Sequence, residues 1–153
     1  MVNSIASNKS SIKLVFPGEP VAQGRPRFSA AGGYVRAYDP AKSKGYKEYL
    51  RMMAEHQMQG SPPFEGALVL SVQVFRPMPK AFSKKKKEQC EQGLLRPITR
   101  PDLDNYIKGI KDALSGICWL DDAQIVAYKE PFGKFYSSRP RVEVWIKELE
   151  EQA

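Results

Sequence analysis

A chain of 153 residues is about the size of one domain and is too short for two comfortable ones. Its net charge of +7 and pI near 9.4 indicate an anionic partner, with nucleic acid first and a membrane surface as the weaker alternative. A single histidine, and two cysteines that form no CxxC pair, argue against a zinc site, a disulfide framework and most histidine-dependent hydrolases.

The chain begins with a polar segment, residues 1–10, in which we expect a flexible N-terminal tail. We expect one domain over residues 11–150. No apolar run reaches the roughly 20 residues that span a membrane, and the N-terminus lacks the hydrophobic segment of a signal peptide. We therefore expect a cytoplasmic protein.

The first half of the chain predicts two strands with a basic loop and a helix between them. Residues 11–18 alternate apolar and polar positions and end in Pro-Gly, as strands do. Residues 19–40 predict a basic loop, because prolines and glycines accompany three arginines. Asp39-Pro40 predicts the start of a helix that continues to about residue 59. Residues 66–77 are the best candidate for a central strand.

The second half predicts two helices followed by two strands. A short charged helix over 83–93 has Ser83 as its cap and Gly93 at its end, and another helix begins near Asp104. Residues 123–132 and 141–149 are strand-like, with 133–138 as their connection. This order predicts an α+β fold: a two-layer arrangement of helices on a mixed, mainly antiparallel sheet. We assign both tryptophans, Trp119 and Trp145, to the core.

The helix near Asp104 has two distinct sides. One is an apolar stripe, formed by Ile107, Ile110, Ala113, Leu114 and Ile117. On another side Lys108 lies one turn beyond Asp104, close enough to pair with it or to share a ligand. Asp112 is one turn further, where it orients Lys108 or contributes to helix packing.

Three further aspartates flank this helix in the sequence. Asp102 points to the same side as Asp104 if the chain before the helix is extended, and Asp121 and Asp122 follow the helix. A helix over 104–115 is about 18 Å long, and residues 116–121 span at most about 20 Å, so the acidic pair can return to the helix start. Mg²⁺ takes such oxygen ligands and needs no histidine. Capping and solvated turns are the favoured explanation for each aspartate taken singly, but the joint pattern favours a metal site more, so the residues alone leave both explanations open.

Residues 100–126, RPDLDNYIKGIKDALSGICWLDDAQIV, resemble the RusA family of Holliday junction resolvases, which are endonucleases of bacteria and phages. The resemblance rests on D-x-D-N-x-x-K, D-A-L and W-L-D-D-x-Q in order, and GRPRF at 24–28 is similar to a family segment. It implies an enzyme of DNA recombination and repair that cuts branched DNA, the four-way junction, by paired symmetric nicks.

The resemblance also implies roles for individual residues. It makes Asp102, Asp104 and Asp122 ligands of Mg²⁺, with Mn²⁺ as the alternative, and Asp121 a supporting residue and a possible further ligand. Lys108 matches a catalytic lysine. Arg100 matches a basic position that handles DNA. The family consists of homodimers, and a two-fold symmetric junction suits a dimer with two sites.

The basic loop is the expected DNA-binding element. Arg25, Arg27 and Arg36 alternate with Phe28 and Tyr34, a combination suited to phosphate contacts and base stacking. The alternative is an ordinary surface loop. Two rival functions remain: a branched-DNA-binding protein without catalysis, and a broader nuclease for flaps and forks.

Overall fold

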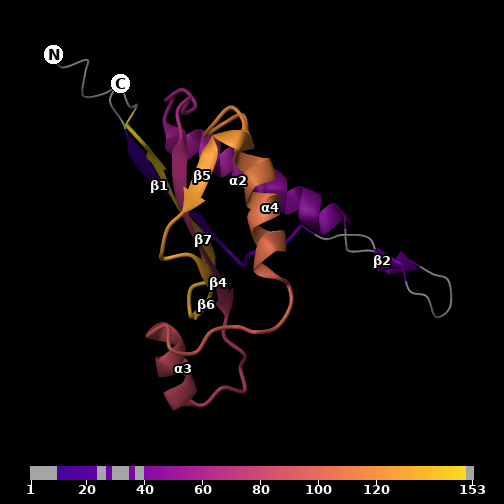
Figure 1. Ribbon diagram of the computed structural model, residues 1–153. Coiled ribbons are helices and arrows are strands. Elements are labelled where there is room, and N and C mark those ends of the chain that lie inside the picture. The colour runs from indigo at the N-terminus through magenta and orange to yellow at the C-terminus, as the bar shows by residue number, and fades with distance from the viewer. Residues whose placement is uncertain (1–9, 24–26, 29–34, 37–39, 151–153) are drawn as a thin grey trace.

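The structure is a computed structural model that describes residues 10–23, 27–28, 35–36 and 40–150. Figure 1 shows its helices and strands, which follow the expected α+β order with two differences described below. The elements are β1 (Ser11–Pro17), β2 (Arg27–Phe28), β3 (Val35–Arg36), α2 (Pro40–Met58), β4 (Leu68–Pro77), α3 (Lys84–Glu91), α4 (Leu103–Leu114), the 3₁₀ helix η1 (Asp122–Gln124), β5 (Ile125–Tyr128), β6 (Gly133–Ser137) and β7 (Arg141–Glu148).

β4 is the central strand of a mixed five-stranded sheet, as predicted for residues 66–77. It pairs antiparallel with β7, which in turn pairs antiparallel with β1. Along its other edge β4 pairs in parallel with β5 and, further on, with β6. The antiparallel ladders are the longer ones, so the mixed sheet predicted from the order of elements is confirmed.

The core lies between the sheet and the helices α2 and α4, which pack against each other (Figure 1). In β4 every second side chain is buried, because strand residues alternate between the two faces of a sheet. β1, β7 and the predicted stripe of α4 meet this row. The buried residues are Leu14, Phe16, Leu68, Leu70, Val72, Val74, Ile107, Ile110, Ala113, Leu114, Val142, Val144 and Ile146.

Two segments predicted to be irregular contain strands. The 133–138 segment is not a connection but the strand β6, whose only buried residues are Gly133 and Ser137. β6 therefore shows no apolar alternation that would reveal it. Within the 19–40 segment, β2 and β3 form a short antiparallel pair, so this part is not loop throughout. The expected cap Asp39 lies outside the described residues.

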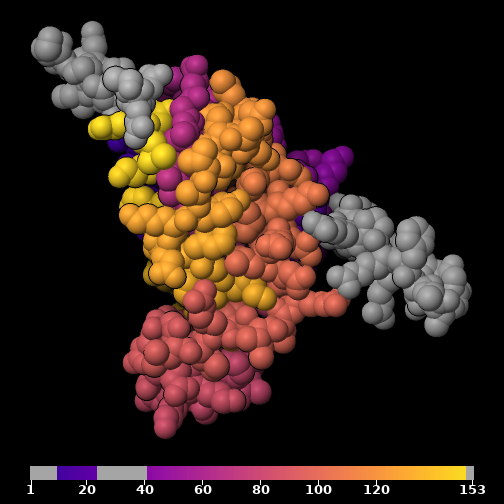
Figure 2. Space-filling view, in the orientation of Figure 1, coloured from indigo at the N-terminus to yellow at the C-terminus, as the bar shows by residue number. Residues whose placement is uncertain are grey.

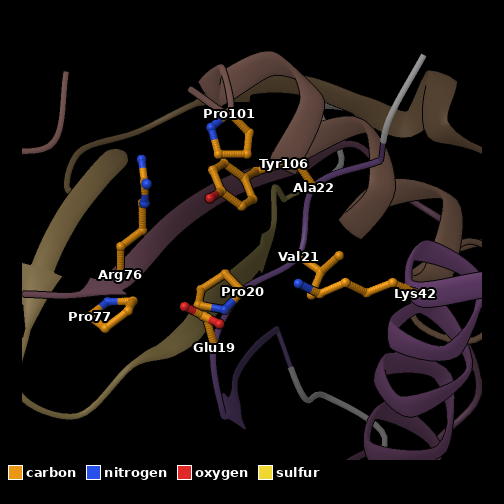
Figure 3. Close-up of a pocket in the computed structure, with 9 residues that line it drawn as sticks. All are labelled: Glu19, Pro20, Val21, Ala22, Lys42, Arg76, Pro77, Pro101 and Tyr106. Carbon is orange, nitrogen blue, oxygen red and sulfur yellow. The ribbon is translucent and has the colours of Figure 1, made fainter. Parts of the chain in front are cut away.

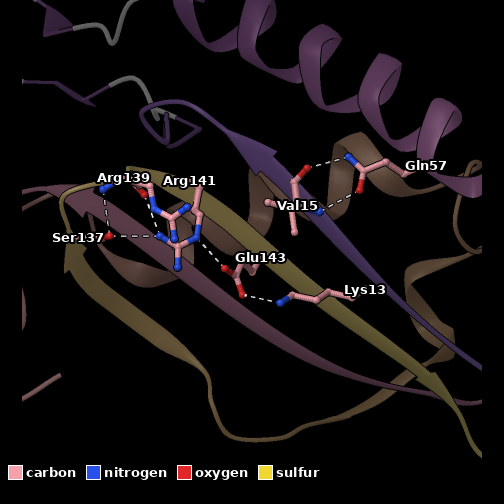
Figure 4. Close-up of polar contacts among 7 residues, drawn as sticks. All are labelled: Lys13, Val15, Gln57, Ser137, Arg139, Arg141 and Glu143. Atoms are coloured by element: carbon pink, nitrogen blue, oxygen red, sulfur yellow. Dashed lines mark hydrogen bonds and ion pairs between the residues drawn. The ribbon is translucent and has the colours of Figure 1, made fainter. Parts of the chain in front are cut away.

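The two tryptophans differ in burial. Trp119 is fully buried, as predicted, whereas Trp145 is 44% exposed and its assignment to the core was wrong. Its neighbours Val144 and Ile146 point to the helices, so Trp145 faces the opposite side of the sheet. There it lies beside Lys13, which with Arg141 surrounds Glu143 (Figure 4).

The residues around α3 project from the lower end of the molecule in the view of Figure 2. Ser83 caps α3 by accepting a hydrogen bond from the Lys86 N–H, and Gly93 follows its end, as predicted. Among the helices of the described residues, none has both the length and the apolar character needed to cross a membrane.

Candidate active site

Asp102 occupies the N-cap position of α4, but its carboxylate does not cap the helix. Its backbone carbonyl accepts hydrogen bonds from the N–H groups of Asn105 and Tyr106, at 3.1 and 3.3 Å. The side chain is exposed and forms no cap hydrogen bond. Helix capping therefore does not explain this aspartate, and its carboxylate is open to a ligand.

The exposed side of α4 forms one wall of a cavity of about 530 Å³. Asp104 and Lys108 line it from α4, and Asp122 lines it from η1. The chain leaving α4 thus does return along the helix. The remaining lining residues are Ile107, Lys111, Asp112, Tyr128 and Phe132. Lys111 of α4 donates a 3.3 Å hydrogen bond to the hydroxyl of Tyr128 in β5, so the two elements are joined at this cavity.

Asp122 is oriented by the hydrophobic core. Its Oδ1 accepts a 2.7 Å hydrogen bond from Nε1 of the fully buried Trp119. An indole N–H in the core needs such a partner. Within the part of the chain described, no hydrogen bond engages Oδ2 of Asp122, so that oxygen is available to a bound ion.

Asp121 has a different role from its neighbour. Its carboxylate accepts a 2.9 Å hydrogen bond from the Ala123 N–H, while Gln124 Oε1 accepts one from the Asp121 N–H at 2.8 Å. This reciprocal capping box begins η1. Asp121 is exposed and does not line the cavity, so of the two aspartates Asp122 is the one turned toward Asp104 and Lys108.

Asp112 links two helices rather than orienting Lys108. Its carboxylate lies 3.6 Å from Lys47 Nζ of α2. Of the two roles expected for Asp112, helix packing is the one supported. With the described residues Lys108 forms no ion pair, which leaves its ammonium group to the cavity.

The structure brings Asp104, Lys108 and Asp122 to one cavity, whereas Asp102 is exposed and does not line it. Among the described residues, no three His, Cys, Asp or Glu side chains lie close enough together to hold a metal ion. Mg²⁺, however, is typically held by one or two carboxylates and completes its shell with water and substrate phosphate. The donor set therefore fits a hard divalent cation.

Two cations near Asp102 were missed by the sequence analysis. Lys134 Nζ donates to the backbone carbonyls of Thr99 and Pro101, and Arg76 donates to that of Thr99. Burial, and then the nearby Arg76 charge, lower the pKa of Lys134, while Asp102 acts in the opposite direction. Arg76 had a signal, because it continues the period of two set by Leu70, Val72 and Val74; Lys134 had none, because β6 was not predicted.

A second cavity, of about 280 Å³, adjoins the start of α4 on another side (Figure 3). Arg76 and Pro101 line it together with Tyr106, a buried residue of α4. Burial raises the pKa of the Tyr106 hydroxyl, and the Arg76 charge partly offsets this. Arg76 therefore lines this cavity and also donates a hydrogen bond to the Thr99 carbonyl.

The predicted DNA-binding loop, residues 19–40, contacts α4 through Gln23. The Gln23 N–H donates a 3.2 Å hydrogen bond to the Asn105 carbonyl, and Gln23 packs against Gly109. Beyond this contact, Arg27 and Arg36 are directly opposite each other in the β2–β3 pair. Arg25 and Tyr34 lie outside the described residues. Arg100 is exposed next to Pro101 and Asp102.

Comparison with known proteins identifies the family of this chain. The family Endodeoxyribonuclease RusA matches residues 17–147, which include the described residues of both cavities. The chain is also 52% identical over 140 residues to "Uncharacterized protein YqaN" of Bacillus subtilis (strain 168), an alignment that covers 90% of this chain and 96% of the relative. With α4, its aspartates and Lys108 inside the matched region, the chain belongs to the RusA family of endodeoxyribonucleases.

Proposed function

We propose that this protein is a Mg²⁺-dependent endonuclease that resolves four-way DNA junctions by paired symmetric nicks during DNA recombination and repair. The observation that carries the proposal is the meeting of Asp104, Lys108 and Asp122 on one cavity. Membership of an endodeoxyribonuclease family supports it. The net charge of +7 supports an anionic substrate.

Asp104 and Asp122 would hold the ion, and the family resemblance adds Asp102, which lies outside the lining of this cavity in the structure, as a further ligand. When bound, Mg²⁺ lowers the pKa of a coordinated water and neutralises charge on the scissile phosphate, and Mn²⁺ suits the same oxygen ligands. Trp119 keeps Asp122 in one orientation through its indole N–H. Lys108, with no ion pair to a described residue, contacts the phosphate oxygens as negative charge develops on them.

DNA binding is assigned to Arg100 and to the arginines of the basic loop. Arg100 lies two residues before Asp102. Arg25, Arg27 and Arg36 belong to the basic loop, which contacts α4 through Gln23 before the first of these arginines. Phosphate contacts of this kind position a protein on DNA without reading sequence. A homodimer completes the proposal, because two matched incisions across a symmetric junction need two related sites.

The test compares three DNA substrates of equal length: a four-way junction, a flap and a linear duplex, each with Mg²⁺, with Mn²⁺ and with a chelator. A junction resolvase gives symmetric nicks in the four-way junction and leaves the duplex intact. Cleavage of flap and junction alike indicates a broader nuclease. Junction binding without any metal-dependent cleavage indicates a binding protein and contradicts the proposal.

A further inference from the structure

The segment before α4, residues 96–101, carries Arg100 and leads directly to Asp102. We name it the lead-in segment. Pro97 is buried, but the next three residues are exposed, and Ile98 is 95% exposed. No backbone–backbone hydrogen bond joins residues 96–101 to any other described residue. The position of the lead-in segment therefore depends on side chains that reach it from the sheet.

Those side chains are cationic and come from the adjacent strands β4 and β6. Lys134 Nζ donates to the carbonyl oxygens of Thr99 and Pro101 at 2.9 and 3.1 Å. Arg76 Nη1 donates to the Thr99 carbonyl at 2.9 Å and to the Thr99 hydroxyl at 3.4 Å. Hydrogen bonds from charged donors are stronger than neutral ones, so these four bonds provide a firm attachment.

The attachment is reciprocal. Arg96 Nε donates a 2.9 Å hydrogen bond to the backbone carbonyl of Lys134, and its guanidinium lies over the Phe135 ring at 4.0 Å. Gly133 has a φ of +149°, which L side chains rarely adopt, and a Cβ there would also displace the Arg96 guanidinium. The lead-in segment and β6 thus hold each other at both ends, near Arg96 and near Pro101.

The place of these cations in the sheet is informative. Val74 pairs with Lys134, and Arg76 follows Val74 by two residues, so both cations continue the face of the sheet that elsewhere packs against helices. Here the apolar row of Leu70, Val72 and Val74 gives way to charge. Partial burial of a charged side chain at the end of an apolar row is unfavourable, and the hydrogen bonds of each cation to backbone carbonyls offset this cost.

We propose that Lys134 and Arg76 are positioning residues for the cleavage reaction: by holding the carbonyls of Thr99 and Pro101, they set where Asp102 and Arg100 lie. The proposal rests on the proposed function, since it assigns these two residues to the same site. Neither cation needs to touch the substrate. A misplacement of about 1 Å in a reacting group reduces the rate by roughly 10²-fold.

The test replaces Lys134 with Met, which keeps the length of the side chain and removes its donors, and with Arg, which keeps charge and donors. Lys147→Met is the control, because Lys147 is an exposed lysine of β7, which β4 separates from β6 in the sheet. For each variant, single-turnover cleavage at saturating four-way junction, the junction Kd in chelator and the melting temperature are measured. Hydrogen exchange of the Asn105 and Tyr106 amides, which donate to the Asp102 carbonyl, is followed in the free protein.

We expect Lys134→Met to lower the cleavage rate by about 10²-fold, with a junction Kd equal to that of Lys147→Met. Exchange of the Asn105 and Tyr106 amides becomes faster in Lys134→Met alone, and Lys134→Arg recovers most of the cleavage rate. Arg76→Met tests the same attachment and decides the matter if Lys134→Met does not fold.

Two results overturn the positioning role. One is unchanged cleavage and unchanged exchange in Lys134→Met. The other is a weaker junction Kd with an unchanged rate at saturation, which assigns Lys134 to direct DNA contact. If the wild-type protein cleaves no DNA, the proposed function fails, and the exchange data, which need no substrate, still show whether Lys134 holds the lead-in segment.

Discussion

The indole N–H of Trp119 donates a 2.7 Å hydrogen bond to Oδ1 of Asp122. A side chain that is fully buried in the core therefore orients a carboxylate of the candidate active site. Partners that orient metal ligands in this way typically affect metal affinity or activity by about 10–100-fold.

Trp119→Phe should lower metal affinity and junction cleavage by at least about tenfold, because it removes the donor and keeps most of the ring. Isothermal titration with Mn²⁺ and single-turnover cleavage measure the two effects. Trp145→Phe, an exposed change on the opposite face of the sheet, is the control and should leave both unchanged. Equal effects of the two changes would show that Asp122 does not depend on Trp119.

Asp104→Asn should abolish junction cleavage while junction binding is kept or becomes tighter, because it removes a negative charge near the DNA phosphate. Gel-shift titration without metal and cleavage with Mg²⁺ separate the two effects. Asp112→Asn is a suitable control, since Asp112 lines the same cavity and pairs with Lys47. Retained cleavage by Asp104→Asn would refute the assignment of Asp104 as a ligand.

Gly109→Val should weaken junction binding. A Cβ added at Gly109 would lie 3.3 Å from Gln23 Cβ, so a branched side chain must displace the segment that leads into the basic loop or incur about 1–3 kcal/mol of overpacking. Gly45→Val makes the same change in α2, where a Cβ meets nothing within 4 Å. The junction Kd of the two variants decides: equal values would show that the loop does not depend on its contact with α4.

Stability should fall at acid pH through Glu143 (Figure 4). Burial alone would raise its pKa, but the hydrogen bonds from Arg141 and Lys13 outweigh burial and lower it. A carboxyl group with a lowered folded pKa stabilises the protein above its unfolded pKa and loses this contribution as pH falls through the folded pKa.

Glu143→Gln should therefore destabilise the protein near pH 7 and differ less from wild type at a pH below the lowered folded pKa of Glu143, where both side chains are neutral. Urea unfolding at about these two pH values measures the difference. Glu65→Gln, at an exposed position, serves as the control. A destabilisation by Glu143→Gln that is the same at both pH values would contradict the role of this charge.

Both cysteines should resist alkylation in the folded protein. Burial raises the pKa of Cys118 to about 12 and raises that of Cys90, and the thiolate is the reactive form. Mass spectrometry after iodoacetamide treatment should find both unmodified until denaturant is added. Rapid labelling of Cys118 under native conditions would show that the turn after α4 opens readily.

The sequence analysis succeeded where one side chain pattern decides the structure. The apolar spacing from Ile107 to Leu114 predicted the buried side of α4, and the alternation in 66–77 predicted the central strand. It failed for β6, because this strand is held by backbone pairing and shows no apolar pattern. It also could not separate Asp121 from Asp122, since only the turn of η1 decides which carboxylate caps and which lines the cavity.

Residues that act on backbone groups were the hardest to predict. The bonds from Lys134 to Thr99 and Pro101 join positions more than 30 residues apart. They involve carbonyl oxygens, which every residue has. No residue type at the receiving end could therefore indicate the contact. Trp145 shows the converse case, in which an apolar residue type suggested burial although the strand alternation opposed it.

The candidate site is attached to the fold by two different physical means. Asp104 and Asp122 are tied to the core through α4 and Trp119, whereas the segment before Asp102 is held by cations that bind carbonyl oxygens. Regions with few apolar contacts open at lower free energy than the core. Under rising denaturant, Asp102 should thus separate from the other two carboxylates before global unfolding begins, and cleavage should be lost while most of the secondary structure remains.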